Sequence, residues 1–216
     1  KNRAIREQHR MEMTNAVAHN LKTPLCIING FSENLREESG YLTKQHYINV
    51  IQEQANEMDI LVHKMLDFSK LETDSAKLNI KSFNIKTELE NIAKKYNNIS
   101  SKNIIVTADD KEIFADKELM ELVFENLIEN AVKYSKDNSD IEISFANNNF
   151  NISNECDEIS KKDLKKIWKP YNRLEKDEEV RGTGIGLSIV KHILKLHRIK
   201  PYTEYSGGRL IIGFYI

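Results

Sequence analysis

The sequence predicts two parts in series, a long helical hairpin followed by an α+β domain. Residues 1–72 repeat apolar side chains every three or four positions, which is the period of an amphipathic helix. After residue 77 the pattern changes, and short alternating runs are interleaved with helical stretches. A chain of 216 residues is long enough for one large domain or two modest ones.

The first helix is expected over residues 1–38. Its apolar residues recur at spacings of four or three, close to the repeat of about 3.5 residues in helices that pack along one another. Gly40 can end this helix, and Thr43 can cap the next one. The residues of this predicted seam are Met13, Val17, Leu21, Pro24, Ile28, Phe31 and Leu35.

A second helix is expected from about residue 44 to residue 72, with a seam of its own. Two long amphipathic helices joined by a short turn make an antiparallel hairpin. A single hairpin cannot bury both seams well, so we expect a four-helix bundle made by two chains, a homodimer formed through residues 1–72. The seam residues are Ile48, Ile51, Ala55, Met58, Val62 and Met65.

Residues 73–77 are small and polar and indicate a linker, so that residues 78–216 form the second part. Asp116 is the expected N-cap of the clearest helix in this part, and the Ser206-Gly207-Gly208 segment separates two final strands. The other expected strands cover residues 78–83, 104–107, 112–115, 141–145 and 150–153, and the helices cover 85–97, 116–134, 160–167 and 185–197.

Composition excludes several classes of protein. Lys and Arg number 32 and Asp and Glu 33, so the net charge of −1 gives no electrostatic reason to expect nucleic acid as a partner. Cys26 and Cys156 are far apart, which excludes a disulfide scaffold and a cysteine-based zinc site. No apolar run approaches the ~20 residues that span a bilayer. Because no signal peptide is visible and the chain opens on Lys1, we expect a cytoplasmic fragment of a longer protein.

A glycine cluster precedes the helix expected near residue 185. Closely spaced glycines before a helix let backbone N–H groups approach phosphate oxygens, and the helix N-terminus favours their negative charge. The cluster is neither a dinucleotide fingerprint nor a P-loop, since the required strand and the GK[ST] ending are missing. The alternative is a flexible glycine turn. The residues concerned are Gly182, Thr183, Gly184, Ile185, Gly186 and Leu187.

A polar face is expected on the helix over residues 116–134. Asn126, Asn130, Lys133 and Tyr134 are spaced so that they share one side of a helix. Amide oxygens one turn apart can approach Mg²⁺ directly or through its waters, and a lysine supplies a point charge for phosphates. The alternative is a polar stripe that is simply solvated.

A third pattern surrounds His19 on the first helix. His19 and Thr23 lie opposite the apolar seam, on the outer face of the helix. Pro24 removes the hydrogen bond to the carbonyl of Asn20 and distorts the helix beside His19. Taken alone, a lone helical histidine is more often solvated than reactive.

Together these motifs resemble the sensor histidine kinases of two-component signalling. Residues 19–25, 126–134, 167–173 and 182–187 resemble, in order, the H box, N box, F box and second glycine box of that family. The resemblance implies a dimerisation and phosphotransfer domain over residues 1–72. It also implies an ATP-binding domain of the GHKL superfamily, an α/β sandwich, over residues 78–216.

The resemblance also implies the reaction and its partners. The γ-phosphoryl group of ATP would pass to His19 and then to an Asp of a response regulator, while Thr23 would position the water that dephosphorylates that regulator. Mg²⁺ would be held by Asn130. The sensor region and any membrane span would lie upstream, which implies the cytoplasmic portion of an inner or plasma membrane protein. The residues implied to contact ATP are Asn126, Asn130, Lys133, Tyr134, Asn154, Arg181, Gly182, Thr183, Gly184, Gly186 and Leu187.

Two departures from the family pattern keep alternatives open. Asn20 stands where the family has Glu or Asp, and Asn154 stands at the Asp of a first glycine box whose glycines are missing. These changes favour a kinase-impaired, nucleotide-binding phosphatase or scaffold as the alternative. A second alternative is a non-enzymatic helical dimerisation module joined to an unrelated domain.

Overall fold

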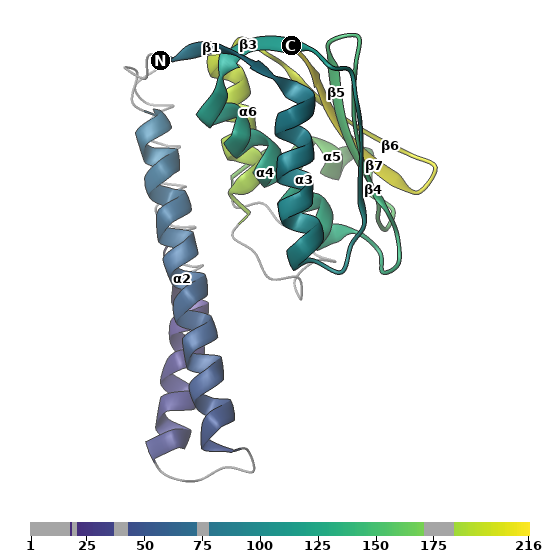
Figure 1. Ribbon diagram of the computed structural model, residues 1–216. Coiled ribbons are helices and arrows are strands. Elements are labelled where there is room, and N and C mark those ends of the chain that lie inside the picture. The colour runs from purple at the N-terminus through teal and green to yellow at the C-terminus, as the bar shows by residue number, and fades with distance from the viewer. Residues whose placement is uncertain (1–17, 19–20, 37–42, 73–77, 171–183) are drawn as a thin grey trace. The chain divides into compact units, whose positions relative to one another are not determined.

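The computed structural model describes residues 18, 21–36, 43–72, 78–170 and 184–216, with side chains described up to residue 63 on the second helix. The chain divides into two compact units, Lys1–Lys70 and Leu71–Ile216 (Figure 1). The first unit is helical, and the second combines helices with two sheets.

The first unit is the predicted hairpin. A helix over residues 21–36 packs beside α2 (Lys44–Glu72), and the ring of Phe31 meets that of Tyr47 edge to face with centroids 5.7 Å apart. On the first helix Pro24 is buried and the other predicted seam residues in the described stretch are half-buried. The predicted seam is therefore confirmed over residues 21–35.

The buried stripe of α2 differs from the predicted seam by one position. Tyr47 and Leu61 are buried, whereas Ile48 and Val62 remain 38% and 40% exposed. Adjacent apolar residues point about 100° apart on a helix, so only one of each pair can face the first helix. An apolar stripe through Ile48 and Val62 thus remains open within the described part of the chain, as expected of half a four-helix bundle.

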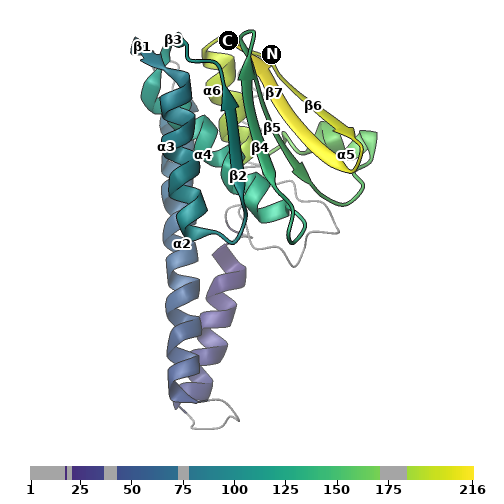
Figure 2. The ribbon, with the colours of Figure 1, turned by 45° about the vertical axis from the view of Figure 1, so that its right-hand side comes forward.

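The second unit is a two-layer α/β sandwich, which confirms the predicted fold class. Helices α3, α4 and α6 cover one face of a five-stranded sheet of order β2-β4-β5-β7-β6 (Figure 2). β2 runs parallel to β4, and the other neighbours are antiparallel. A separate pair is formed by β1 and β3. The strands are β1 (Ile80–Asn84), β2 (Ile104–Ala108), β3 (Glu112–Asp116), β4 (Ile141–Ala146), β5 (Asn149–Glu155), β6 (Pro201–Ser206) and β7 (Arg209–Tyr215), and the helices are α3 (Ile85–Ile99), α4 (Lys117–Tyr134), α5 (Lys161–Lys166) and α6 (Gly186–Leu196).

Alternate residues of the sheet form the core beneath the helices. Phe150 of β5 pairs in register with Phe145 and Phe214. Its ring stacks on Phe214 at 4.8 Å and meets Phe124 of α4 at 5.1 Å. All four of these aromatic side chains are fully buried, so the sheet and α4 are joined by close aromatic packing.

Asp116 connects the beginning of α4 to the end of α6. Its carboxylate accepts hydrogen bonds from the backbone N–H of Leu119 and of Asn79, which confirms the predicted N-cap. Its own N–H donates to Nε2 of His197 over 3.1 Å. Nδ1 of His197 therefore carries the proton, and it donates to the carbonyl of Ile193 over 2.9 Å.

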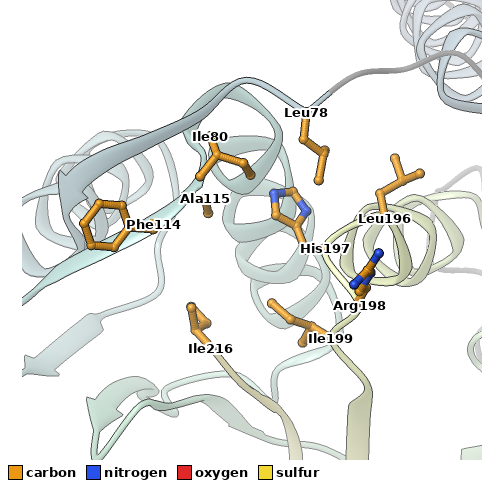
Figure 3. Close-up of a pocket in the computed structure, with 9 residues that line it drawn as sticks. All are labelled: Leu78, Ile80, Phe114, Ala115, Leu196, His197, Arg198, Ile199 and Ile216. Atoms are coloured by element: carbon orange, nitrogen blue, oxygen red, sulfur yellow. The ribbon is translucent and has the colours of Figure 1, made fainter.

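A cavity of about 420 Å³ lies beside His197, between the β1–β3 pair and the end of α6 (Figure 3). It contains none of the residues predicted to contact ATP. It is therefore distinct from the expected nucleotide site, which involves the opposite end of α6. The lining residues are Leu78, Ile80, Phe114, Ala115, Leu196, His197, Arg198, Ile199 and Ile216.

Arg198, directly after α6, has a positive φ of 60°. A β-carbon in this conformation costs about 1–2 kcal/mol, which glycine avoids. We therefore expect Arg198→Gly to raise the free energy of unfolding of the second unit by about 1 kcal/mol. Urea denaturation followed by the fluorescence of Trp168, the single tryptophan, would measure it. Arg198→Ala is the matched control, because it removes the same charge but keeps the β-carbon; an equal gain in both variants would contradict the argument.

Candidate functional site

The predicted polar face is present on α4. Asn126 is only 4% exposed, while Asn130, Lys133 and Tyr134 are half-buried. The Lys133 ammonium lies 5.9 Å from the centre of the Tyr134 ring. Since Asn126 points into the protein, this face is not a stripe of simply solvated residues.

Asn126 lies against the first residue of α6. Its Nδ2 donates to the carbonyl of Leu122 over 2.7 Å, which leaves Oδ1 buried and without a hydrogen-bond partner in the structure. A β-carbon built on Gly186 would stand 2.9 Å from that oxygen. Glycine at position 186 therefore allows α6 to begin directly beside the amide of Asn126.

The start of α6 offers backbone donors without a side-chain cap. Gly184 has a positive φ of 66°, and the buried Ile185 at the N-cap position contributes no capping side chain. The first N–H groups of a helix lack partners inside the helix and favour an anionic group. Leu187 is half-buried in this first turn. The other predicted contacts in this segment, Arg181, Gly182 and Thr183, lie outside the described residues.

The end of β5 is joined to the turn that follows α4. The backbone N–H of Lys136 donates to the carbonyl of Glu155 over 2.9 Å. Asn154, the residue before Glu155, is 4% exposed, and its Nδ2 donates to the Glu155 carbonyl over 3.3 Å. The polar face, the glycine cluster and Asn154 therefore all lie next to parts of α4 or the turn that follows it.

A neighbouring side of α4 is fixed to α3. The hydroxyl of Tyr96 donates to Glu129 over 3.1 Å, and Lys95 forms an ion pair with Glu125 at 2.7 Å. The hydrogen bond from Lys95 to Glu125, together with the charge of that carboxylate, raises the pKa of Lys95. Burial, followed by the charge of Glu129, raises the pKa of Tyr96. The part-buried bond of Tyr96 to Glu129 fixes the rotation of α4, whereas the largely exposed Lys95–Glu125 pair contributes little to it.

The described residues offer amide oxygens to a metal, not a carboxylate cluster. No three His, Cys, Asp or Glu side chains of the described ranges gather as a metal site. The amide oxygen of Asn130 is of the kind that Mg²⁺ prefers. A divalent ion here would therefore depend on a bound anion for most of its remaining ligands.

The predicted residues of the hairpin are only partly described. His19 and Asn20 lie outside the described residues. Thr23 is exposed on the helix over residues 21–36, where Pro24 is buried. Thr23 is thus accessible to a partner of the first unit.

Two features around the site were missed by sequence reasoning. Lys102 donates to the carbonyls of Ser135 and Lys136, and Lys136 bonds the end of β5. Both contacts join residues that are far apart in the chain, and neither belongs to a periodic pattern or a motif. No local signal in the sequence could have found them.

Comparison with known families assigns both units. Residues 9–74 match the His Kinase A (phospho-acceptor) domain. Residues 115–212, which include α4, α6 and the end of β5, match the histidine kinase-, DNA gyrase B-, and HSP90-like ATPase family. The chain belongs to the sensor histidine kinase family. His19 falls within the phospho-acceptor match, and Asn126, Asn154 and Gly186 fall within the ATPase match.

Individual relatives agree with the family. The chain is 29% identical over 218 residues to the sensor protein kinase WalK of Staphylococcus aureus, an alignment that covers 94% of this chain and 52% of WalK. In WalK of strain Newman the same match covers 36% of the relative. The chain therefore spans about half the length of these relatives or less. Among the described residues, no helix is both long and apolar enough to cross a membrane.

Solved structures share the fold. Histidine kinase ThkA, in complex with the response regulator protein TrrA, superposes with a TM-score of 0.77 at 24% identity, covering 99% of this chain and 63% of that one. Histidine kinase AdeS of Acinetobacter baumannii gives a TM-score of 0.69 at 21% identity, covering 92% and 96%. The order of a helical hairpin and an α/β sandwich is thus that of known histidine kinases.

Gly186→Ala should destabilise the second unit by about 1–3 kcal/mol, because the new methyl group meets Oδ1 of Asn126. Asn126→Ala removes that oxygen. In the double variant we therefore expect a loss smaller than the sum of the two single losses by about 1 kcal/mol or more. Urea denaturation of the four proteins, followed by Trp168 fluorescence, gives the coupling. Additive losses would show that the two residues do not press on each other.

Proposed function

We propose that this chain is the phosphotransfer core of a sensor kinase, which binds ATP in its second unit and phosphorylates His19. The observation that carries this proposal is the contact between Asn126 and Gly186. It places a buried amide oxygen beside an uncapped helix N-terminus, within the region that matches an ATPase family. The domain roles follow: residues 1–72 dimerise and accept the phosphoryl group, residues 73–77 link, and residues 78–216 bind ATP.

The described residues fit a nucleotide with its metal. Gly184, which precedes α6, and Gly186 and Leu187 in its first turn receive phosphate oxygens on backbone N–H groups. Lys133 adds positive charge, and Tyr134 lies beside the nucleotide. Asn154 accepts a hydrogen bond from the adenine amino group. Arg181, Gly182 and Thr183 are proposed to contact the phosphates from the adjoining segment.

Asn126 and Asn130 are the residues proposed to face the metal. The buried, unpartnered oxygen of Asn126 needs a donor, which a metal-bound water provides. Asn130 would hold Mg²⁺ through its amide oxygen. When bound, Mg²⁺ supplies positive charge that neutralises the phosphate oxygens. The protein's own contribution is to orient the phosphates in the first turn of α6.

The transfer itself makes modest demands on His19. The neutral form of an imidazole carries a free nitrogen lone pair, so no strong base is needed to generate the nucleophile. The nitrogen lone pair attacks the γ-phosphorus, a P–N bond forms, and the bond to ADP breaks. Asn20 can accept a hydrogen bond from the ring N–H and so orient it. It cannot supply the negative charge that stabilises the developing cation.

The partners follow from the first unit. The apolar stripe through Ile48 and Val62 is proposed to pack against the same stripe of a second chain, giving a homodimer. A receiver domain of a response regulator is the proposed acceptor of the phosphoryl group, and the ThkA structure, solved with the response regulator TrrA, supports this partner. Membrane attachment is proposed only for a sensor region outside this sequence.

A second candidate function is a nucleotide-binding phosphatase or scaffold with impaired kinase activity. Asn20 and Asn154 favour it, because both remove a charge that the kinase pattern carries. Thr23 favours a phosphatase, since its hydroxyl is exposed on the first helix and can orient water without an acidic neighbour.

Labelled ATP separates these functions. We expect incubation with [γ-³²P]ATP and Mg²⁺ to label the chain with an acid-labile, base-stable phosphoryl group, the stability pattern of phosphohistidine. His19→Ala should remove the label while ATP still binds in a calorimetric titration. Absence of nucleotide binding by the unaltered chain would refute the kinase and the nucleotide-binding alternative together.

Asn20→Asp and Asn20→Glu should raise the initial rate of phosphohistidine formation, because a carboxylate both orients the imidazole and stabilises its cation. The gain should be smaller than the ~10²–10⁴-fold effect of a general acid–base group, since a neutral imidazole needs no base to free its lone pair. Quench-flow with labelled ATP measures the rate. Asn20→Ala is the control and should lower it. Unchanged or lower rates in both acidic variants would contradict this role.

Thr23→Ala should slow dephosphorylation of the cognate phospho-regulator far more than it slows phosphohistidine formation. The hydroxyl positions water for the first reaction and has no part in the second. The measurement follows labelled regulator and labelled kinase separately over time. Thr23→Ser, which keeps the hydroxyl, should retain most of the phosphatase activity. Equal losses in both reactions would count against this assignment.

A further inference from the structure

The turn after α4 is held by a nearly buried lysine. The side chain of Lys102 is 10% exposed, and its ammonium donates to the carbonyls of Ser135 and Lys136 over 3.2 and 2.7 Å. It also pairs with Asp137 at 3.2 Å. An ammonium group has three donors, so the turn uses all of them.

The contacts of Lys102 hold the backbone of the turn in place, and do not only pair one charge with another. Lysine is rarely buried, and removing its ammonium from water is costly. Asp137 is fully exposed and contributes little to offset that cost, whereas two backbone carbonyls at the negative end of α4 receive the donors. Ser135, which caps the C-terminus of α4, is one of the two. The main effect of Lys102 is therefore to fix the path of the chain where it leaves α4.

The same turn is held from its other side by β5. The N–H of Lys136 donates to the carbonyl of Glu155 over 2.9 Å, and its ammonium pairs with Asp157 at 3.2 Å. Lys136 is therefore held through its carbonyl by Lys102 and through its N–H by Glu155. Such consecutive hydrogen bonds polarise and reinforce one another.

The turn joins two pieces of the proposed nucleotide site. Tyr134 directly precedes it at the end of α4, and Asn154 directly precedes Glu155 at the end of β5. We propose that Lys102 is a positioning residue for nucleotide binding, which sets the separation between Tyr134 and Asn154 without touching the ligand. This inference rests on the proposed function, since it assumes that both residues contact the nucleotide.

If Lys102 only stabilised the fold, its loss would weaken nucleotide binding no more than the loss of another ion pair. Lys95 provides that comparison. Lys95 of α3 also forms an ion pair with a residue distant in the sequence, Glu125, at 2.7 Å. Glu125 lies on the side of α4 that faces α3, away from the turn. Lys95→Met removes a more exposed ion pair between α3 and α4 and leaves the turn intact. Lys102→Arg keeps the charge and can donate to two carbonyls at once, so it should rescue the position.

The test compares ATP binding and kinetics in the full chain. Lys102→Met should raise the Kd for Mg-ATP by about tenfold or more, because misplacement of contacts by about 1 Å can cost up to ~100-fold. In autophosphorylation the KM for ATP should rise while kcat changes little. Lys95→Met should leave Kd within about twofold, and Lys102→Arg should recover most of the affinity. All four proteins are measured below their unfolding transitions, as checked by Trp168 fluorescence.

The outcomes separate the two proposals. If the unaltered chain binds Mg-ATP and Lys102→Met binds it equally well, the positioning role is overturned and the nucleotide site stands. If Lys95→Met and Lys102→Met weaken binding equally, general stability explains the effect and the positioning role is again overturned. If the unaltered chain binds no ATP, the proposed function fails and the inference fails with it. A rise in Kd confined to Lys102→Met, with rescue by Lys102→Arg, supports it.

Discussion

The contact between Asn126 of α4 and Gly186 of α6 determines where the second unit can hold an anion. Without a β-carbon at position 186, α6 begins directly beside a buried amide whose oxygen has no hydrogen-bond partner in the structure. An unpaired buried acceptor costs about 1–3 kcal/mol, and a bound donor such as a metal-held water removes that cost. The positive end of the α6 dipole faces the same region. Without a ligand, the unpaired oxygen of Asn126 therefore lowers the stability of the second unit slightly. A bound donor would restore that stability.

The accuracy of that contact depends on how α4 is anchored. Asp116 caps its start and ties it to His197 at the end of α6. Tyr96 fixes the side of α4 that faces α3, and Lys102 fixes its end. Each anchor lies outside the ligand-facing surface. These anchors therefore hold Asn126 and Asn130 in a fixed rotation without using the side chains that are proposed to meet the nucleotide.

Periodic features of this chain could be predicted from the sequence, and tertiary contacts could not. The strands and helices of residues 78–216 were expected within about three residues of their observed bounds, and the cap at Asp116 was expected from its residue type. The face of α2 was predicted one position away, because Tyr47 and Ile48 are both apolar and periodicity alone cannot say which of them meets the first helix. The hydrogen bonds of Lys102 to residues 135–137 and of His197 to Asp116 follow no periodic spacing. The sequence pattern therefore could not predict them.

Asn154, one of the two asparagines that depart from the family pattern, replaces a charged hydrogen-bond acceptor by a neutral one. Asn154 is almost fully buried at the end of β5, where a carboxylate would face both the desolvation cost and the nearby Glu155 carbonyl. An amide avoids both, because its Nδ2 donates to that carbonyl and leaves Oδ1 as the acceptor for a base. A neutral acceptor gives a weaker hydrogen bond than a charged one. If Asn154 contacts adenine as proposed, recognition of the base relies more on accurate placement, which is the role that we propose for Lys102 at the neighbouring turn.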